Sequence, residues 1–234
     1  MPENAGRELR QLAASLSQWL RYQRRLGLKA LPGEAGVRPK EETGREQKIP
    51  TLEEIRAEMG KCRRCKLYPG ATKLVFGEGN PDADLMFIGE APGAEEDLQG
   101  LPFVGAAGQL LNNMLSKLGL RREEVYITNV VKSRPPGNRD PEPDEIEACR
   151  PFLLKQIEAV RPRVIVTLGK VATQVVLGTK EPLTRIRGRW QRYDHIRVMP
   201  TFHPSYLLRF PKERHKTWVD MQQVMEYLAA QEEN

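Results

Sequence analysis

The sequence predicts an α/β protein with a largely parallel sheet covered by helices on both faces. Short apolar strand patterns occur at 84–88, 125–130, 163–168 and 196–201. Helical patterns lie between and after them, at about 105–118, 143–159, 169–177 and 212–231. Short apolar strands that alternate with helices are typical of parallel sheets whose two faces are both buried.

Length, charge and hydropathy limit the class of protein. The chain has 234 residues, with 37 basic and 31 acidic side chains and a formal net charge of +6. This excess is compatible with a phosphate-rich partner but does not by itself indicate one. No apolar run reaches the roughly 18–20 residues that cross a bilayer, and the amino-terminal segment lacks the apolar core of a secretory signal. We therefore expect a cytoplasmic protein that contacts no membrane.

The first 50 residues differ from the rest of the chain. Apolar residues at helical spacing, among many Arg and Gln, predict a basic helix over 7–26, and a Pro-, Gly- and charge-rich stretch follows to about residue 49. That composition is typical of a flexible linker. We therefore predict a basic helix and linker at 1–50 and a folded domain at 51–234. A surface helix, a disordered segment and a partner- or DNA-binding segment all remain open for 1–50.

The folded domain begins with a helix-capping pattern. Thr51 is followed three residues later by Glu54, the spacing at which the two residues satisfy the free amides at a helix start. The predicted helix reaches Lys61 and leads into the pair Cys62 and Cys65.

The stretch 89–111 indicates an active site. The apolar strand at 84–88 runs directly into a loop with four acids, and a Pro-Phe-Val-Gly turn then opens a helix. Placing acidic side chains at the carboxyl end of a buried strand costs folding free energy, so such acids are expected to have a function. Ligand sites in open α/β sheets lie at this end of the strands.

Other polar residues follow the later strands, and a parallel sheet brings them to the same edge. They are Asn129, Gly169 and the Thr201–Pro204 segment. An Asn side chain matches the imide edge of a nucleobase, an aromatic such as Phe103 can stack on it, and His203 can donate to an oxygen that gains negative charge. Glu90 or Glu96 could orient a water or stabilise a cationic sugar. Taken singly, each residue has an ordinary structural explanation: a turn Asn, a surface His, a core Phe, or a solvated helix start for the acids.

Four separated motifs then resemble the family 4 uracil-DNA glycosylases, iron–sulfur members of the uracil-DNA glycosylase superfamily. The motifs are Gly89-Glu-Ala-Pro-Gly with Glu96-Asp97 and Gly100-Leu-Pro-Phe-Val-Gly105, Ile127-Thr-Asn-Val-Val-Lys132, Arg134-Pro-Pro-Gly-Asn138-Arg, and Phe202-His-Pro-Ser-Tyr-Leu-Leu-Arg209. The similarity runs from about residue 51 to 230. It implies a three-layer α/β/α sandwich with a central, mostly parallel four-stranded sheet, acting on uracil in DNA.

The resemblance also implies roles for individual residues. Phe103 would stack on the extruded uracil, Asn129 would read its imide edge, and His203 would hydrogen-bond uracil O2 as the base departs. Glu90, Ala91 and Gly93 would surround the attacking water. Among the remaining positions, Glu96 falls on an acid implicated in catalysis and Asn138 on a further polar active-site position.

A DNA-contacting segment is implied as well. It comprises Pro204, Ser205, Tyr206, Leu207, Leu208 and Arg209, and Arg134 also matches a DNA-contacting position. Tyr206, Leu207 and Leu208 are candidate wedges, because apolar side chains inserted at a base step stabilise a kinked duplex. Several basic residues are expected on the DNA side for salt-dependent phosphate contacts: Lys132, Arg134, Arg139, Arg185, Arg187, Arg189, Arg209 and Lys212.

The cysteines depart from the family pattern. The chain has three, an odd count that does not favour a disulfide framework. Two incidental thiols would give the same Cys62-x-x-Cys65 spacing as a metal site. The resemblance implies a [4Fe–4S] cluster on four cysteines, of which Cys62, Cys65 and Cys149 match three, while Ser133 stands at the fourth position. Serine is a harder ligand for iron than thiolate, so an alkoxide ligand, a labile or three-iron cluster and an empty site all remain open. We expect a cluster with an unusual fourth position.

These observations predict a monomeric, monofunctional uracil-DNA glycosylase that acts on single- and double-stranded uracil-containing DNA and leaves an abasic site. One alternative is a superfamily member that captures uracil-DNA without turnover. Another is a nucleotide-binding α/β protein. The second alternative is weakened because neither G-x-G-x-x-G nor G-x-x-x-x-G-K-[ST] occurs.

Overall fold

A computed structural model describes residues 49–230 of the chain. The predicted basic helix at 7–26 and nearly all of the predicted linker lie outside the described residues, so the division of the chain near residue 50 stays a prediction. Among residues 49–230, no helix combines the length and the apolar character needed to cross a bilayer.

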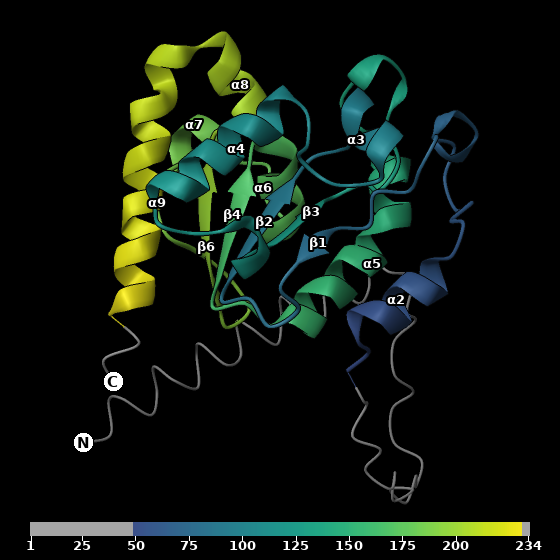
Figure 1. Ribbon diagram of the computed structural model, residues 1–234, viewed down its shortest axis with the longest axis horizontal. Helices are drawn as coiled ribbons and strands as arrows, with labels where there is room; N and C mark the ends of the chain where they lie inside the picture. The colour runs from purple at the N-terminus through teal and green to yellow at the C-terminus, as the bar shows by residue number, and fades with distance from the viewer. Residues whose placement is uncertain (1–48, 231–234) are drawn as a thin grey trace, which may run out of the picture. The chain divides into compact units, whose positions relative to one another are not determined.

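A six-stranded mixed sheet lies at the centre of the described part (Figure 1), in the order β1-β3-β2-β4-β6-β5. The strands are β1 (Glu78–Gly79), β2 (Leu85–Gly89), β3 (Tyr126–Asn129), β4 (Val164–Leu168), β5 (Gln191–Tyr193) and β6 (Ile196–Thr201). The four central strands are parallel, as predicted, and the two edge strands pair antiparallel with β3 and β6. The predicted four-stranded parallel sheet is therefore present as the centre, and two short edge strands extend it to six. Edge strands of two and three residues are too short to show a pattern in the sequence.

Helices connect and cover the strands. They are α2 (Leu52–Met59), α3 (Ala94–Gln99), α4 (Ala106–Lys117), α5 (Pro143–Val160), α6 (Lys170–Leu177), α7 (Leu183–Ile186), α8 (Pro204–Arg209) and α9 (Arg214–Ala229), with 3-10 turns η1 (Tyr68–Gly70), η2 (Arg122–Glu124), η3 (Pro136–Asn138) and η4 (Pro211–Glu213). The predicted capping box is confirmed, because the Glu54 amide donates to Thr51 Oγ1 at 3.2 Å and the Thr51 amide donates to Glu54 Oε2 at 2.8 Å. Helix α2 ends at Met59, slightly before the predicted Lys61.

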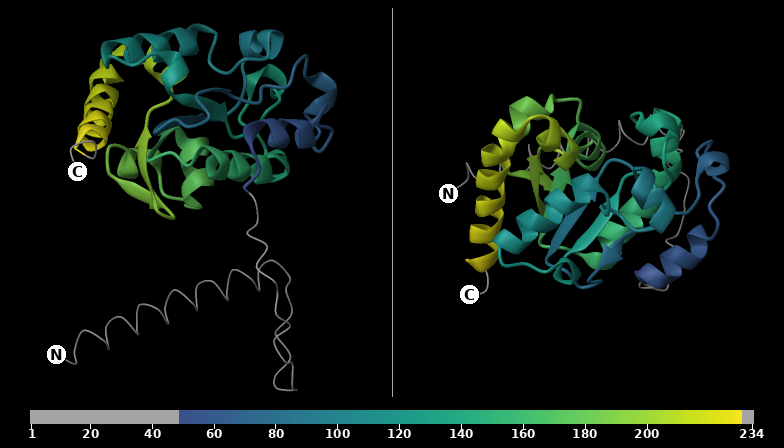
Figure 2. Two further views of the ribbon diagram at one scale, coloured as in Figure 1. Left: turned by 60° about the horizontal axis from the view of Figure 1, so that its bottom comes forward. Right: turned by 45° about the horizontal axis from the view of Figure 1, so that its top comes forward.

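Two hydrophobic clusters fill the two sides of the sheet. On one side, Met86 and Ile88 of β2 belong to the same cluster as Leu153 of α5. On the other side, Phe87 of β2 packs in a cluster with Val224 of α9. Successive residues of β2 thus point to opposite faces, as the period of a strand requires. Figure 2 shows the resulting layers, with α5 and α6 on one face of the sheet and α4 and α9 on the other, which confirms the predicted α/β/α sandwich.

The parallel strands end side by side. Gly89 of β2 lies in register with Asn129 of β3, and Leu168 of β4 lies in register with Thr201 of β6. Backbone hydrogen bonds continue past the strand ends, since the Gly169 amide donates to the Thr201 carbonyl at 2.9 Å. The loops that follow these strands are therefore held at one edge of the sheet.

Candidate active site

A cleft of about 610 Å³ lies at the carboxyl ends of the parallel strands. This volume is within the range of small-molecule sites. The loops after β2, β3, β4 and β6 all contribute to its lining. Every predicted catalytic and uracil-binding residue lines this one cleft: Glu90, Ala91, Gly93, Glu96, Phe103, Asn129, Asn138 and His203.

Asn129 presents an unused acceptor in the cleft. The residue is 1% exposed, and its side-chain Oδ1 has no hydrogen-bond partner among residues 49–230. A Cβ placed on Gly89 would lie 2.3 Å from this oxygen and 2.5 Å from Cζ of Phe103. Glycine at this position therefore lets the amide and the ring approach each other. A buried acceptor without a donor costs roughly 1–3 kcal/mol, a cost that a ligand N–H would remove.

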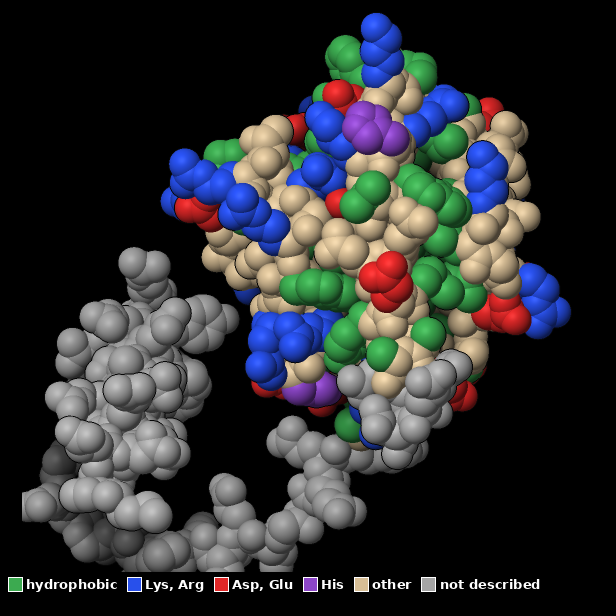
Figure 3. All heavy atoms as spheres, turned by 90° about the vertical axis from the view of Figure 1, so that its left-hand side faces the viewer, with side chains coloured by type: hydrophobic (Ala, Val, Ile, Leu, Met, Phe, Trp, Pro, Cys, Tyr) green, Lys and Arg blue, Asp and Glu red, His purple; other side chains and the backbone are tan. Residues whose placement is uncertain are grey.

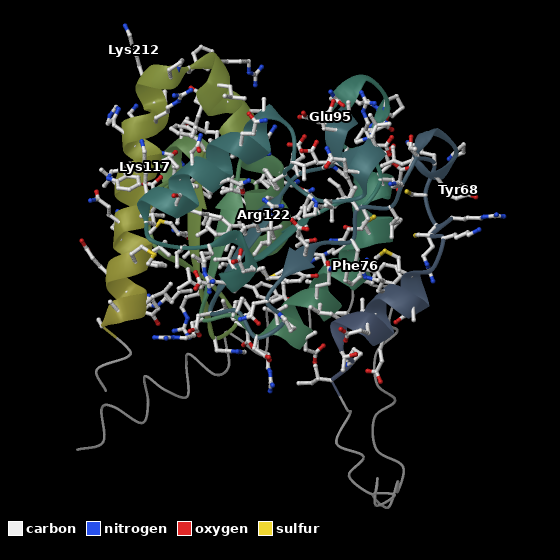
Figure 4. The ribbon with its side chains drawn as sticks, in the orientation of Figure 1. Tyr68, Phe76, Glu95, Lys117, Arg122 and Lys212 are labelled. Carbon is white, nitrogen blue, oxygen red and sulfur yellow. The ribbon has the colours of Figure 1, made fainter. Side chains whose placement is uncertain are left out.

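The Phe103 backbone adopts a left-handed conformation, with φ of 51°. For a residue other than glycine this costs roughly 1–2 kcal/mol. Arg122 holds the turn, since its Nη1 donates to the Phe103 carbonyl at 3.2 Å and its Nη2 donates to the Pro102 carbonyl. The same guanidinium donates to Asn112 Oδ1 at 2.9 Å and pairs with Glu78. Figure 4 labels Arg122 in the middle of the domain. No local pattern marks Arg122, because its partners Pro102, Phe103, Asn112 and Glu78 come from several distant segments.

His203 is neutral, with a defined tautomer. Burial lowers its pKa to about 4, although the nearby Glu96 acts in the opposite direction. Its Nδ1 accepts a hydrogen bond from the Ser205 backbone amide at 3.1 Å. An amide can only donate, so the ring proton lies on Nε2. The ring lies beside Phe103, with the two centroids 5.6 Å apart, so the imidazole offers an Nε2–H donor next to the aromatic ring.

Two carboxylates in the cleft have different surroundings. The pKa of Glu90 is raised to about 7, mainly by burial and in addition by the charge of Asp140, while Lys170 acts in the opposite direction. A carboxyl that titrates near neutral pH is suited to acid–base catalysis.

Glu96 instead binds backbone amides with both of its oxygens. Oε1 accepts from the amides of Val104 and Gly105, each at 2.8 Å, and Oε2 accepts from the amide of Gly93 at 3.1 Å. Glu96 is 8% exposed and its neighbour Asp97 is 3% exposed. The interpretation of these acids as a solvated helix start is therefore wrong. Glu96 joins the loop after β2 to the turn that carries Phe103.

The DNA-contacting segment forms α8, and its side chains differ in exposure. Leu207 is 4% exposed, while Leu208 is 39% exposed. The prediction that Leu207 is a wedge is wrong for this arrangement, because α8 packs Leu207 and Pro204 into the domain. Ser205, Tyr206 and Arg209 line the cleft.

Several of the basic residues expected on the DNA side have partners within the protein. Lys132 is 1% exposed, and its Nζ donates to Thr128 Oγ1, the Asn129 carbonyl and Gln156 Oε1, each at 2.6 Å. The expectation that Lys132 contacts phosphates is therefore wrong, since the chain turns inward after β3. Arg134 remains partly exposed, and its Nε donates to Asn138 Oδ1 at 2.8 Å.

The three thiols lie outside the cleft, around α5. Cys149 of α5 is buried, and burial raises its pKa, with Cys65 and Cys62 near enough to add to this effect. Cys65 packs against the same hydrophobic cluster as Cys149. Ser133 is 6% exposed. Among residues 49–230, no three His, Cys, Asp or Glu side chains are arranged to hold a metal ion. Thiolates are ligands of the kind that iron–sulfur clusters use, so the chemistry of the three thiols suits a cluster although their arrangement among residues 49–230 does not gather them around one ion.

Comparison with known proteins agrees with the geometry of the cleft. The profile of the Uracil DNA glycosylase superfamily matches residues 76–229. The chain belongs to this superfamily. It is 50% identical over 162 residues to a type 4 uracil-DNA glycosylase of Thermotoga maritima, an alignment that covers 68% of this chain and 83% of the relative. A type 4 enzyme of Sulfurisphaera tokodaii is 46% identical, with coverage of 75% and 84%.

A third relative covers a similar share of the chain. The type 4 uracil-DNA glycosylase of Archaeoglobus fulgidus is 44% identical over 184 residues, which is 75% of this chain and 92% of the relative. These similarities place the chain in the type 4 branch of the uracil DNA glycosylase superfamily, as the four sequence motifs predicted.

Proposed function

We propose that this protein is a monofunctional uracil-DNA glycosylase, which hydrolyses the N-glycosidic bond of uracil in single- and double-stranded DNA and leaves an abasic site. The unpartnered Oδ1 of Asn129 beside the Phe103 ring carries the proposal. Uracil supplies the complementary groups: a flat ring, an N3–H donor and two carbonyl oxygens. The membership in the type 4 branch supports the same function.

Recognition requires that the nucleotide leave the helix, because a glycosylase cannot reach the sugar–base bond inside a stacked duplex. The extruded uracil stacks on Phe103. The uracil N3–H donates to Oδ1 of the Asn129 side chain, and the NH2 group of the same side chain donates to uracil O4. Cytosine presents an acceptor at N3 and a donor at its exocyclic amine. In cytosine, the N3 acceptor would face Oδ1 of Asn129, and the amine donor would face the side-chain NH2 group. A site built from buried hydrogen-bonding groups discriminates strongly against such a mismatched ligand.

Bond cleavage moves the electron pair of the C1′–N1 bond onto the base and leaves positive charge on the sugar. The Nε2–H of His203 donates to uracil O2, where negative charge develops. A donor placed in this way is typically worth roughly 3–4 kcal/mol. The water oxygen bonds to C1′, and the Glu90 carboxylate accepts the proton that the water loses. Ala91 and Gly93 form the backbone around this water.

Glu96 and Asn138 have supporting roles in this proposal. The Glu96 carboxylate is occupied by three amides, so it positions the loop after β2 against the Phe103 turn rather than reacting. The Asn138 Oδ1 accepts a hydrogen bond from Arg134 Nε at the rim of the cleft. Arg134 and Arg209 would contact phosphates there.

We also propose that Cys62, Cys65 and Cys149 hold a [4Fe–4S] cluster with Ser133 at the fourth position. The cluster would join the segment after α2 to α5 and the loop after β3, and its chemistry would be structural. Ser133→Cys should increase iron content after anaerobic reconstitution and slow the loss of visible absorbance in air. Equal iron content and equal decay in wild type and variant would contradict this assignment.

The other functional predictions are also proposals: a monomer that acts in the cytoplasm, with a basic extension at 1–50 appended to the glycosylase domain. The central test incubates the full chain with single- and double-stranded uracil oligonucleotides, followed by alkaline cleavage of abasic sites. Multiple-turnover strand scission supports the proposed function. A stable protein–DNA adduct would instead indicate capture without turnover, and nucleotide binding without reaction would indicate the nucleotide-binding alternative.

A further inference from the structure

Three aromatic rings form a continuous series from the cleft to the outer end of α8. We call Phe202, Tyr206 and Phe210 the aromatic ladder. The ring centroids of Phe202 and Tyr206 are 4.8 Å apart, with 30° between the planes, and those of Tyr206 and Phe210 are 4.7 Å apart, with 37° between the planes. These separations are typical of interacting aromatic pairs.

The inner end of the aromatic ladder is closed. Phe202 is 8% exposed, and the guanidinium of Arg187 lies 5.1 Å from its ring centroid. Two hydrogen bonds to Asp220, each 2.6 Å long, fix this guanidinium. The inner ring is therefore covered by a fixed cation and by Tyr206.

The outer end is open. Phe210 is 50% exposed. Within the described part of the chain, Tyr206 is its one ring partner, and no cation lies over it. Aromatic residues are enriched at interaction surfaces relative to the rest of a protein surface. One face of Phe210 is therefore available to a planar partner.

Positive charge surrounds this open end. Arg209, Lys212 and Arg214 are exposed at the corner between α8 and α9. Figure 3 shows the side of the molecule that carries α9, with basic side chains beside hydrophobic ones at its top. In Figure 4, Lys212 extends outward from the corner between α8 and α9. Tyr206 and Arg209 also line the cleft. A DNA strand that leaves the cleft along α8 would thus meet these cations and also the exposed face of Phe210.

We propose that the aromatic ladder is a stacking platform for an unpaired DNA base next to the extruded uridine, with Phe210 as the contacting ring. The proposal rests on the proposed glycosylase function, which brings the strand to the cleft. Aromatic rings between cations are the common means of binding single strands without sequence preference, because every base has a π-face. In a duplex the flanking base is already paired and stacked, so the platform serves single-stranded substrate more than duplex.

The first experiment measures binding of the full chain to short oligonucleotides that carry one 2′-fluoro-2′-deoxyuridine, which resists cleavage. Phe210→Ala should weaken single-strand binding about 5- to 20-fold, the lower part of the range for one stacked base, and duplex binding less than about 2-fold. Phe210→Trp should retain binding, and Phe210→Leu should resemble the Ala variant. Val219→Ala is the matched control, because Val219 is an exposed apolar residue of α9, 51% exposed, and it should change neither affinity.

The second experiment tests contact between the ring and the base. Single strands in which the nucleotide on either side of the fluorinated uridine lacks its base are bound to wild type and to Phe210→Ala. On one side, removal of the base should weaken wild-type binding and leave the variant unchanged, a coupling that a structural role of Phe210 does not produce. Additive losses on both sides, or equal losses with single strand and duplex, would overturn the proposal. If wild type cleaves uracil from single strands while the coupling is absent, only the platform fails. If wild type cleaves neither substrate, the proposed function fails.

Discussion

Arg122 should control the activity of the site without touching the base. Its guanidinium donates to the carbonyls of Pro102 and Phe103 and thereby holds a turn with a positive φ at Phe103. The Arg122 side chain is 22% exposed. A hydrogen bond from a charged group contributes roughly 1.5–3 kcal/mol, and partial exposure reduces this to about 1 kcal/mol for each carbonyl.

Loss of both bonds therefore removes about 2 kcal/mol from the conformation that presents the Phe103 ring. The turn also carries an intrinsic backbone cost of roughly 1–2 kcal/mol. Without the two Arg122 hydrogen bonds, other conformations of the turn therefore become populated. A change of about 2 kcal/mol corresponds to a roughly 30-fold change in population. We expect Arg122→Met to lower kcat/KM for uracil excision about 10- to 30-fold, and Arg122→Lys to recover part of the loss.

The assay is excision from a fluorescent uracil oligonucleotide under subsaturating conditions, with a thermal melt of each variant. Arg121→Met is the matched control, because Arg121 is 70% exposed and pairs only with Glu123 and Glu124 within the described residues, and it should keep wild-type activity. Arg122→Met leaves Glu78 without its partner, so the double variant with Glu78→Gln separates stability from activity. Full recovery of kcat/KM in that double variant, or wild-type activity of Arg122→Met, would refute the role of Arg122 at the turn.

The remaining predictions concern three polar residues of the cleft. Glu90 accepts a proton as its carboxylate, and its pKa is about 7. Wild-type kcat should therefore rise with pH and level off above about 7. Glu90→Gln should lower kcat roughly 100-fold or more, and its kcat should not change with pH. The folded-state pKa lies above the ordinary value of 4.5, so folding favours the protonated form; denaturant melts should show wild type losing stability relative to Glu90→Gln as pH rises from about 4.5 through about 7. Asn129→Asp should lower kcat/KM at least about 1,000-fold, since a carboxylate cannot donate to uracil O4; retention of activity in this steady-state assay would remove Asn129 from base recognition. Glu96→Gln should lower unfolding free energy by about 1–3 kcal/mol, because one amide loses its acceptor, while the pH profile keeps its wild-type shape; a shifted profile would show that Glu96 takes part in proton transfer.

Sequence patterns predict the parts of this fold that depend on neighbours in the chain. The buried strands, the helices between them and the Thr51 cap each arise from local periodicity or short spacing, and all are present. The meeting of Phe103, Asn129 and His203 at one cleft also follows, because parallel strands end at the same edge.

Features that depend on tertiary contacts do not follow from local pattern. Lys132 has the sequence context of a surface cation, and only the packing of α5 against the sheet supplies the Gln156 acceptor that permits its burial. Arg122 likewise resembles any charged residue of a surface turn until the chain brings Pro102 and Phe103 to it. Leu207 and Leu208 are indistinguishable in sequence, and the rotation of α8 decides which one is buried.

The missing side chain at Gly89 limits how this enzyme can be redesigned. Even a methyl group there would overlap both the carboxamide oxygen of Asn129 and the tip of the Phe103 ring. The strand that carries Gly89 is central and has neighbours on both sides, so its backbone cannot retreat to make room. Enlarging the cleft for bulkier damaged bases must therefore change lining residues other than Gly89, so that the amide and the ring keep their places.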